Sequence, residues 1–159
     1  MYRVLLVDDE PNILSALRRC LARIDVSQLD GEALQFETFT SPQAAIERSE
    51  EQDFDLVISD YRMPAMNGVE FLSRLMETQP NAPRMIVSGF ADRDAIIAAV
   101  NEVHLARFIE KPWDEEALRR AVVSLLGGAG SAAAKPVDGD MQLEHADDGG
   151  IIIATDDFD

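Results

Sequence analysis

Five polar side chains stand at or close behind the ends of short apolar runs in this sequence. Asp8 and Asp9 directly follow one run, and Asp60 comes close behind another. Ser88 and Lys111 follow two later runs in the same way. Carboxylates bind hard divalent cations, and an ammonium and a hydroxyl can hold phosphoryl oxygens. These residue types could therefore bind a metal ion and receive a phosphoryl group, provided that the fold brings them together.

The pattern of apolar residues predicts five repeats of a strand followed by a helix. The expected strands are 4–7, 35–39, 56–58, 85–87 and 108–109. After each strand, apolar residues recur at three- and four-residue steps, as on the buried face of a helix. Pro11, Ser41 with Pro42, and Asp114 are suited to helix starts. The second helix is expected to end near Glu51 and the fourth to cover 94–101.

This alternation predicts an α/β fold, a doubly wound five-stranded parallel sheet in the order 2-1-3-4-5, flavodoxin-like, with helices on both faces. Ligands of such sheets bind beyond the carboxyl ends of the strands, at the point where the strand order reverses. That point lies between the first and third strands. All five polar side chains follow carboxyl ends, so we expect them to line one crevice.

Three carboxylates in one crevice repel one another and raise at least one pKa unless a cation offsets them. Mg²⁺ is the predicted ion, because it prefers oxygen ligands, whereas a zinc site would need His or Cys. Asp60 follows the central strand and is the best candidate nucleophile for an aspartyl phosphate. Asp8 and Asp9 would then hold the metal. Lys111 and Ser88 would grip the phosphoryl oxygens.

Each of these residues also has an ordinary explanation. An acidic pair after a strand is often only a loop or a helix cap. Ser88 taken alone is more often an ordinary polar residue, and Lys111 taken alone is more often a solvated surface lysine. The joint position of all these groups at four strand ends favours the functional interpretation.

Four segments of the chain resemble the receiver domains of response regulators in two-component signalling. They are 4–11, 56–68, 85–89 and 108–113. The resemblance covers residues 2–126. The Lys-Pro-Trp motif at 111–113 resembles the corresponding segment of one receiver subgroup. Members of that subgroup are often fused to cyclic-di-GMP phosphodiesterase or regulatory ATPase domains.

The resemblance implies a role for each site residue. Asp60 accepts a phosphoryl group from a sensor histidine kinase or a histidine phosphotransfer protein, as in a phosphorelay. Asp60 and Asp9 bind Mg²⁺ directly, and Asp8 assists through water. Arg62 supplies its backbone carbonyl as a further metal ligand. The Lys111–Pro112 peptide bond is expected to be cis.

The resemblance also implies a switch. Ser88 moves toward the phosphoryl group, and Phe108 swings into the space that it leaves. The surface of the fourth helix, fifth strand and fifth helix then changes its affinity for a downstream effector protein, and receivers also form homodimers through this face. Such a domain promotes only its own phosphorylation and dephosphorylation and is otherwise no enzyme.

Charge and composition exclude several other functions. The 159 residues carry a formal net charge of −16, which disfavours direct DNA binding and binding to anionic membranes. No apolar run approaches the roughly 20 residues that a membrane-spanning helix needs. A single cysteine, Cys20, excludes an internal disulfide. We therefore expect a cytoplasmic protein.

The last part of the chain differs from the rest. Residues 1–126 are predicted to form the receiver domain, and 127–159 a Gly/Ala linker with an acidic, disordered tail. Residues 128–159 hold eight acidic side chains and one basic one, a net charge of −7. The tail could be a solubilising end, a partner-binding segment or the start of another domain. One hypothesis is that it folds back or binds a basic partner.

Three rival functions use the same fold or pocket. An aspartyl phosphatase of the haloacid-dehalogenase type needs an acidic residue two positions after its nucleophilic aspartate. Arg62 occupies that position here, which argues against this function. A flavin carrier needs a Ser-, Thr- or Gly-rich loop after the first strand to bind the flavin phosphate. The acidic residues 8–10 occupy that loop here and would repel the phosphate. An interaction module with an inactive pocket stays open. The Arg62 cation beside the site prompts the further hypothesis that it alters the lifetime of the phosphoryl group.

Overall fold

The computed structural model describes residues 1–126, 141–145 and 151–155 of the chain. Its strands are β1 (Tyr2–Val7), β2 (Leu34–Phe39), β3 (Leu56–Ser59), β4 (Arg84–Ser88), β5 (Arg107–Glu110), β6 (Met141–His145) and β7 (Ile151–Thr155). Its α-helices are α1 (Pro11–Leu21), α2 (Pro42–Ser49), α3 (Gly68–Leu75), α4 (Arg93–Ala99) and α5 (Glu115–Leu125). Two 3₁₀ turns, η1 (Val26–Leu29) and η2 (Phe90–Asp92), complete the described elements.

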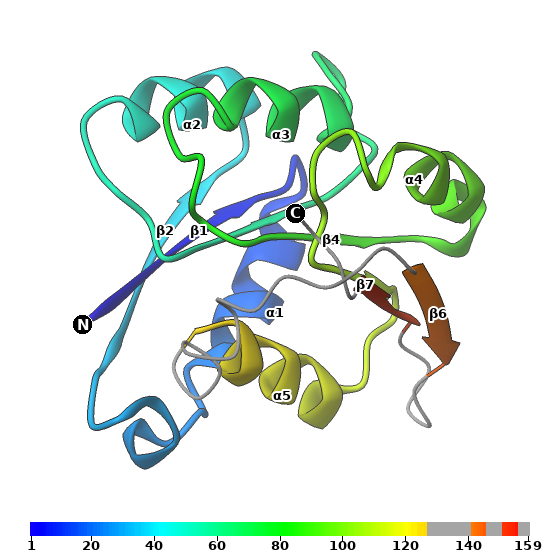
Figure 1. Ribbon diagram of the computed structural model, residues 1–159. Coiled ribbons are helices and arrows are strands. Elements are labelled where there is room, and N and C mark those ends of the chain that lie inside the picture. Colours follow the sequence, from blue (N-terminus) through cyan, green and yellow to red (C-terminus); the bar gives the residue numbers. More distant parts are fainter. Residues whose placement is uncertain (127–140, 146–150, 156–159) are drawn as a thin grey trace.

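The five parallel strands confirm the predicted topology. They lie in the order β2-β1-β3-β4-β5, and every neighbouring pair is parallel. Figure 1 shows α2, α3 and α4 on one side of this sheet and α1 and α5 on the other. The chain therefore has the doubly wound flavodoxin-like arrangement, in which the strand order reverses between β1 and β3.

The sheet separates two apolar cores. Alternate residues of each central strand point to opposite faces, so Leu5 and Val57 join the core under α2, α3 and α4. Leu6 and Ile58 join the core under α1 and α5. β3 and β4 are buried at every position, as expected for strands that are covered on both faces.

Local signals start the helices at the predicted residues. Pro11 is the first residue of α1 and Pro42 of α2, and the Ser41 hydroxyl accepts a hydrogen bond from the Ala44 N–H. The Asp114 carboxylate caps α5 through the Ala117 N–H. The helix ends differ slightly from expectation: α2 ends at Ser49 rather than near residue 51, and α4 covers 93–99 rather than 94–101.

The sequence did not predict the two strands near the carboxyl terminus. β7 pairs antiparallel with β5, with Phe108 opposite Ile151, and β6 pairs antiparallel with β7. The full sheet is therefore seven-stranded, with the β7–β6 hairpin on the β5 edge (Figure 1). The expectation of disorder after residue 126 does not hold for 141–145 and 151–155. For the other residues of 127–159 it falls outside the described part of the chain, so the proposed domain boundary stays a prediction.

Within the described residues, no helix has both the length and the apolar character needed to cross a membrane.

Candidate functional site

Strand pairing brings three carboxylates together at one edge of the sheet. Val7 of β1 lies opposite Ser59 of β3, so the residues that follow them are neighbours in space. Asp8, Asp9 and Asp60 each offer an oxygen atom, and these atoms all lie within 4.8 Å of one another. Asp8 and Asp60 are buried, and Asp9 is partly exposed. The predicted acidic crevice at the point of strand reversal therefore exists.

Lys111 bridges the buried carboxylates of this crevice. Its Nζ lies 3.1 Å from Asp8 Oδ2 and 3.4 Å from Asp60 Oδ1. Its backbone N–H donates to the carbonyl of Ser88, which fixes the β5–α5 loop beside β4. The Lys111–Pro112 peptide is cis, as the sequence resemblance implied. One ammonium thus stands between the two aspartates.

The charges in the crevice shift two pKa values. Burial raises the pKa of Asp8 to about 6, and the Asp60 carboxylate adds to the rise, although the Glu10 N–H and Lys111 oppose it. For Lys111, burial opposes the charged form, but Asp8 and Asp60 outweigh it and raise the pKa of the ammonium. Lys111 therefore does not offset the effect of burial and of Asp60 on the pKa of Asp8.

The donor set fits a hard divalent cation. Carboxylate oxygens are the preferred ligands of Mg²⁺, and three of them lie within 4.8 Å of one another here. The described residues thus meet the expectation of a site for Mg²⁺. The role of the Arg62 backbone carbonyl as a further ligand stays a prediction.

A glycine lets the loop after β3 fold tightly against Asp60. A Cβ atom on Gly68 would lie only 2.3 Å from the backbone carbonyl oxygen of Asp60. The Gly68 N–H also donates to the Tyr61 carbonyl at 2.7 Å. Asn67 and Glu70 form a capping box that begins α3 at this point. The loop that presents Asp60 is therefore held by backbone contact that no larger residue would allow.

Ser88 lies at the end of β4, but its hydroxyl is engaged elsewhere. The Oγ donates to Asp92 Oδ2 at 2.9 Å, and Asp92 Oδ1 lies 2.5 Å from Arg62 Nη2. Asp92 is buried, although it was not among the predicted site residues. Its position four residues after Ser88, on the turn before α4, was the only sequence signal that could have found it.

Phe108, the expected switch aromatic, is fully buried. It packs in the core under α4 together with Ile96, Val100 and Val103. The ring therefore already lies inside while Ser88 faces Asp92. The coupled movement of Phe108 and Ser88 stays a prediction.

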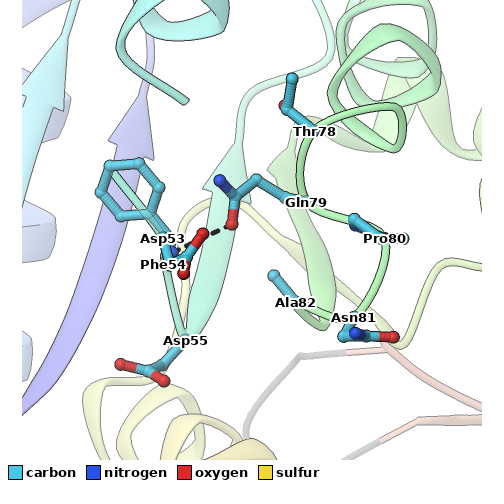
Figure 2. A pocket seen from close by; sticks show the side chains of 8 residues that line it. All are labelled: Asp53, Phe54, Asp55, Thr78, Gln79, Pro80, Asn81 and Ala82. Atoms are coloured by element: carbon cyan, nitrogen blue, oxygen red, sulfur yellow. Dashed lines mark hydrogen bonds between the residues drawn. The ribbon is translucent and has the colours of Figure 1, made fainter. Parts of the chain in front are cut away.

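A separate cavity of about 310 Å³ lies at the opposite end of the strands. Its lining residues come from the segments 53–55 and 78–82, which precede β3 and β4. Figure 2 shows Gln79 reaching toward Phe54 across this cavity. The Gln79 amide oxygen accepts from the Phe54 N–H, and its nitrogen donates to the Ser49 and Gln52 carbonyls. Gln79 therefore joins loops, and the cavity holds none of the predicted site residues.

The comparisons with known proteins agree with this geometry. A family model described as the response regulator receiver domain matches residues 4–123. A hydrogenase transcriptional regulatory protein, HoxA of Cupriavidus necator, is 37% identical over 110 residues, which are 69% of this chain and 21% of HoxA. The C4-dicarboxylate transport transcriptional regulatory protein DctD of Pseudomonas aeruginosa is 32% identical over 76% of this chain and 24% of its own length.

Solved structures give the same result. An uncharacterized protein from Neptuniibacter caesariensis is 40% identical with a TM-score of 0.67, covering 78% of this chain and 88% of its own. The signal receiver domain of an HD domain-containing protein from Pseudomonas fluorescens Pf-5 is 30% identical with a TM-score of 0.64, covering 76% and 90%. The chemotaxis response regulator CheY4 of Vibrio cholerae, at 23% identity and a TM-score of 0.64, covers 79% and 99% and supports the fold.

The extent of these matches limits the likeness to one domain. This chain spans about a quarter or less of the length of HoxA and DctD. The remaining regions of HoxA and DctD lie outside the alignment with this chain. The family model, by contrast, covers most of the present chain, from β1 into α5. The chain therefore belongs to the response regulator receiver domain family.

Proposed function

We propose that Asp60 accepts a phosphoryl group from a sensor histidine kinase or a histidine phosphotransfer protein in a Mg²⁺-dependent reaction. The main support is the position of Lys111, whose ammonium lies 3.1 Å from Asp8 and 3.4 Å from Asp60. An acceptor carboxylate, an acidic pair and a shared cation in one crevice are the groups that phosphoryl transfer needs. Membership in the receiver family supports the same chemistry.

The transfer step uses Asp60 as the nucleophile. A carboxylate oxygen of Asp60 bonds to phosphorus while the bond from phosphorus to the imidazole nitrogen of the donor breaks, and the imidazole takes up a proton. Lys111 turns from its carboxylate partners to a phosphoryl oxygen, where a charge-assisted hydrogen bond is strong. The Ser88 hydroxyl donates a second hydrogen bond to the phosphoryl oxygens once it has left Asp92.

The metal would be held by Asp8, Asp9, Asp60 and the backbone carbonyl of Arg62. When bound, Mg²⁺ supplies positive charge that offsets the charge of the transferring phosphoryl group. Asp8 must be ionised to take part, and the burial that raises its pKa opposes this ionisation. Metal binding and proton loss at Asp8 are therefore coupled.

The output is a change of partner affinity on the face formed by α4, β5 and α5. Phe108 of β5 lies against residues of α4, so a shift in the β4–α4 turn reaches this face through packed side chains. A downstream effector protein, or a second copy of the chain, is the proposed partner. With a net charge of −16 the chain itself is not proposed to bind DNA, and its activity is limited to its own phosphorylation and dephosphorylation in the cytoplasm.

The test is the mass of the intact protein after incubation with acetyl phosphate and Mg²⁺. Wild type is expected to gain one phosphoryl group, and Asp60→Asn to gain none. Chelation of Mg²⁺ before the reaction is expected to prevent the gain. If folded wild type stays unmodified both with acetyl phosphate and with a phosphorylated kinase, the pocket is inactive. The alternative of a phosphorylation-independent interaction module would then replace this proposal.

A further inference from the structure

The hydroxyl of Ser88 is hydrogen-bonded to Asp92 and is not available to bind a phosphoryl group on Asp60. It donates to Asp92 Oδ2 at 2.9 Å, whereas phosphoryl binding needs it at Asp60. Asp92 is only 6% exposed, and its other oxygen is bound by the Arg62 guanidinium at 2.5 Å. The described contacts of the Asp92 carboxylate are thus one serine and one arginine.

The Arg62–Asp92 ion pair connects the two loops on either side of the acceptor. Arg62 lies two residues after Asp60 in the loop between β3 and α3. Asp92 ends the η2 turn, four residues after Ser88, in the connection between β4 and α4. The pair therefore closes a chain of contacts that runs from the acceptor loop through Asp92 to Ser88.

The two partners of this ion pair differ in their dependence on it. The Arg62 side chain is 74% exposed, so water can solvate its guanidinium when the pair opens. A buried carboxylate that loses its cation is destabilised by its desolvation. Without Arg62, the arrangement with Asp92 buried against Ser88 becomes less favourable than one in which the η2 turn opens and Asp92 reaches water.

We propose that Arg62 and Asp92 form a latch that holds Ser88 away from Asp60 and so sets the fraction of the unphosphorylated domain that is ready to bind a phosphoryl group. Asp92 acts as a positioning residue, because it works through Ser88 and does not contact the acceptor. The inference rests on the function proposed above for Asp60 and deepens it. The latch requires both residues, so the loss of either one should open it.

Phosphorylation would open this latch by local electrostatics. Phosphorylation replaces the single negative charge of the Asp60 carboxylate with about two on the phosphoryl group, close in sequence to Arg62, and so offers the guanidinium a competing partner. At the same time, the phosphoryl oxygens compete with Asp92 for the Ser88 hydroxyl. Both changes weaken the hold on η2, which carries the 66% exposed Phe90. Opening of the latch is thereby transmitted to a residue on the surface.

The energetic consequence is a shift between two states. If only a fraction of the molecules is unlatched, the apparent dissociation constant for a phosphoryl mimic is larger than the intrinsic one by the inverse of that fraction. Breaking the ion pair raises the unlatched fraction, so the mimic binds more tightly. A merely structural ion pair would instead lower stability without tightening binding.

The experiment measures the affinity of the full chain for beryllofluoride at saturating Mg²⁺, followed by Trp113 fluorescence or by NMR. Arg62→Gln and Asp92→Asn are each expected to bind at least about threefold more tightly than wild type, and Arg62→Lys, which keeps the charge, to fall between. Arg74→Gln is the matched control, because it removes an exposed arginine of α3 that lies outside both the latch and η2. Its affinity is expected to equal that of wild type.

The double variant Arg62→Gln with Asp92→Asn tests the pairing itself. If the two residues act as one latch, the double variant binds like either single variant, because the second change has nothing left to break. The latch would be overturned if the effects of the two single changes multiplied, if Arg62→Gln changed the affinity by less than about threefold, or if Arg74→Gln changed it as much as Arg62→Gln does. Failure of wild type to bind beryllofluoride at all would instead identify a failure of the proposed phosphoacceptor function, and the latch would fall with it.

Discussion

Asp8 should make the metal-free protein less stable as the pH rises. Its side chain is 1% exposed, and its pKa of about 6 lies above the ordinary value of 3.8 because of burial and the neighbouring Asp60. The folded state therefore binds a proton at Asp8 more tightly than the unfolded state does. The stability that this proton contributes is fully present below pH 3.8 and is lost as the pH rises through 6.

The size of this effect follows from the two pKa values. A shift from 3.8 to about 6 corresponds to about 3 kcal/mol over the whole titration. Between pH 5 and pH 8, the same two values give a loss of about 1.4 kcal/mol in the free energy of unfolding. Asp8→Asn cannot titrate at this position and should not show that loss. The variant should therefore gain about 1.4 kcal/mol relative to wild type between pH 5 and pH 8.

The assay is urea unfolding with a chelator present, followed by the fluorescence of Trp113, the single tryptophan of the chain. Comparison of the variant with wild type at each pH cancels the titration of all other groups that the change leaves alone. The loss of the Lys111 contact in the variant adds an offset that is nearly constant over this range. A difference that stays constant from pH 5 to pH 8, or that moves the other way, would refute the reasoning about burial and charge in the crevice.

Three further predictions concern the loops and the sheet edge. Gly68→Ala should lower the free energy of unfolding by about 1–3 kcal/mol, because its Cβ would collide with the Asp60 carbonyl; urea unfolding measures this, and an unchanged midpoint would contradict it. Lys111→Met should slow phosphorylation by acetyl phosphate about tenfold or more, because a charge-assisted hydrogen bond of about 1.5–3 kcal/mol to the phosphoryl group is lost. A time course of intact mass measures the rate, and equal rates in variant and wild type would contradict the role of Lys111 in binding the phosphoryl group. Truncation after residue 126 should speed amide hydrogen exchange in β5, because β7 no longer covers its edge; unchanged exchange would show that the pairing contributes nothing in solution.

The acidic crevice could be predicted from the sequence because its position depends mainly on which strands are adjacent and parallel. Once the runs before Asp8 and Asp60 are interpreted as adjacent parallel strands, their carboxyl ends must lie at one edge of the sheet. The same rule brings Lys111 to that edge from β5. The alternation of strands and helices predicts a parallel sheet, and the order 2-1-3-4-5 is a common doubly wound order for five such units.

The Ser88–Asp92–Arg62 contacts could not be predicted in this way. They depend on side-chain rotamers and on the shape of two loops, which apolar periodicity does not determine. The sequence did suggest that the Arg62 cation stands near the site, but its buried partner is identified only when the η2 turn is seen. The β7 strand was missed for another reason. The acidic, Gly-rich composition around it indicates disorder, and the strand is identified only by its pairing with β5 and β6.

The most direct measurement locates the phosphoryl group on the chain. Wild type would be phosphorylated with acetyl phosphate and Mg²⁺, reduced with borohydride to convert an acyl phosphate into a stable alcohol, and mapped by peptide mass spectrometry. The predicted result is conversion of Asp60 alone, absent when Mg²⁺ is chelated before the reaction. Conversion of Asp8, Asp9 or another residue in place of Asp60, or conversion that does not require Mg²⁺, would contradict the assignment of the acceptor.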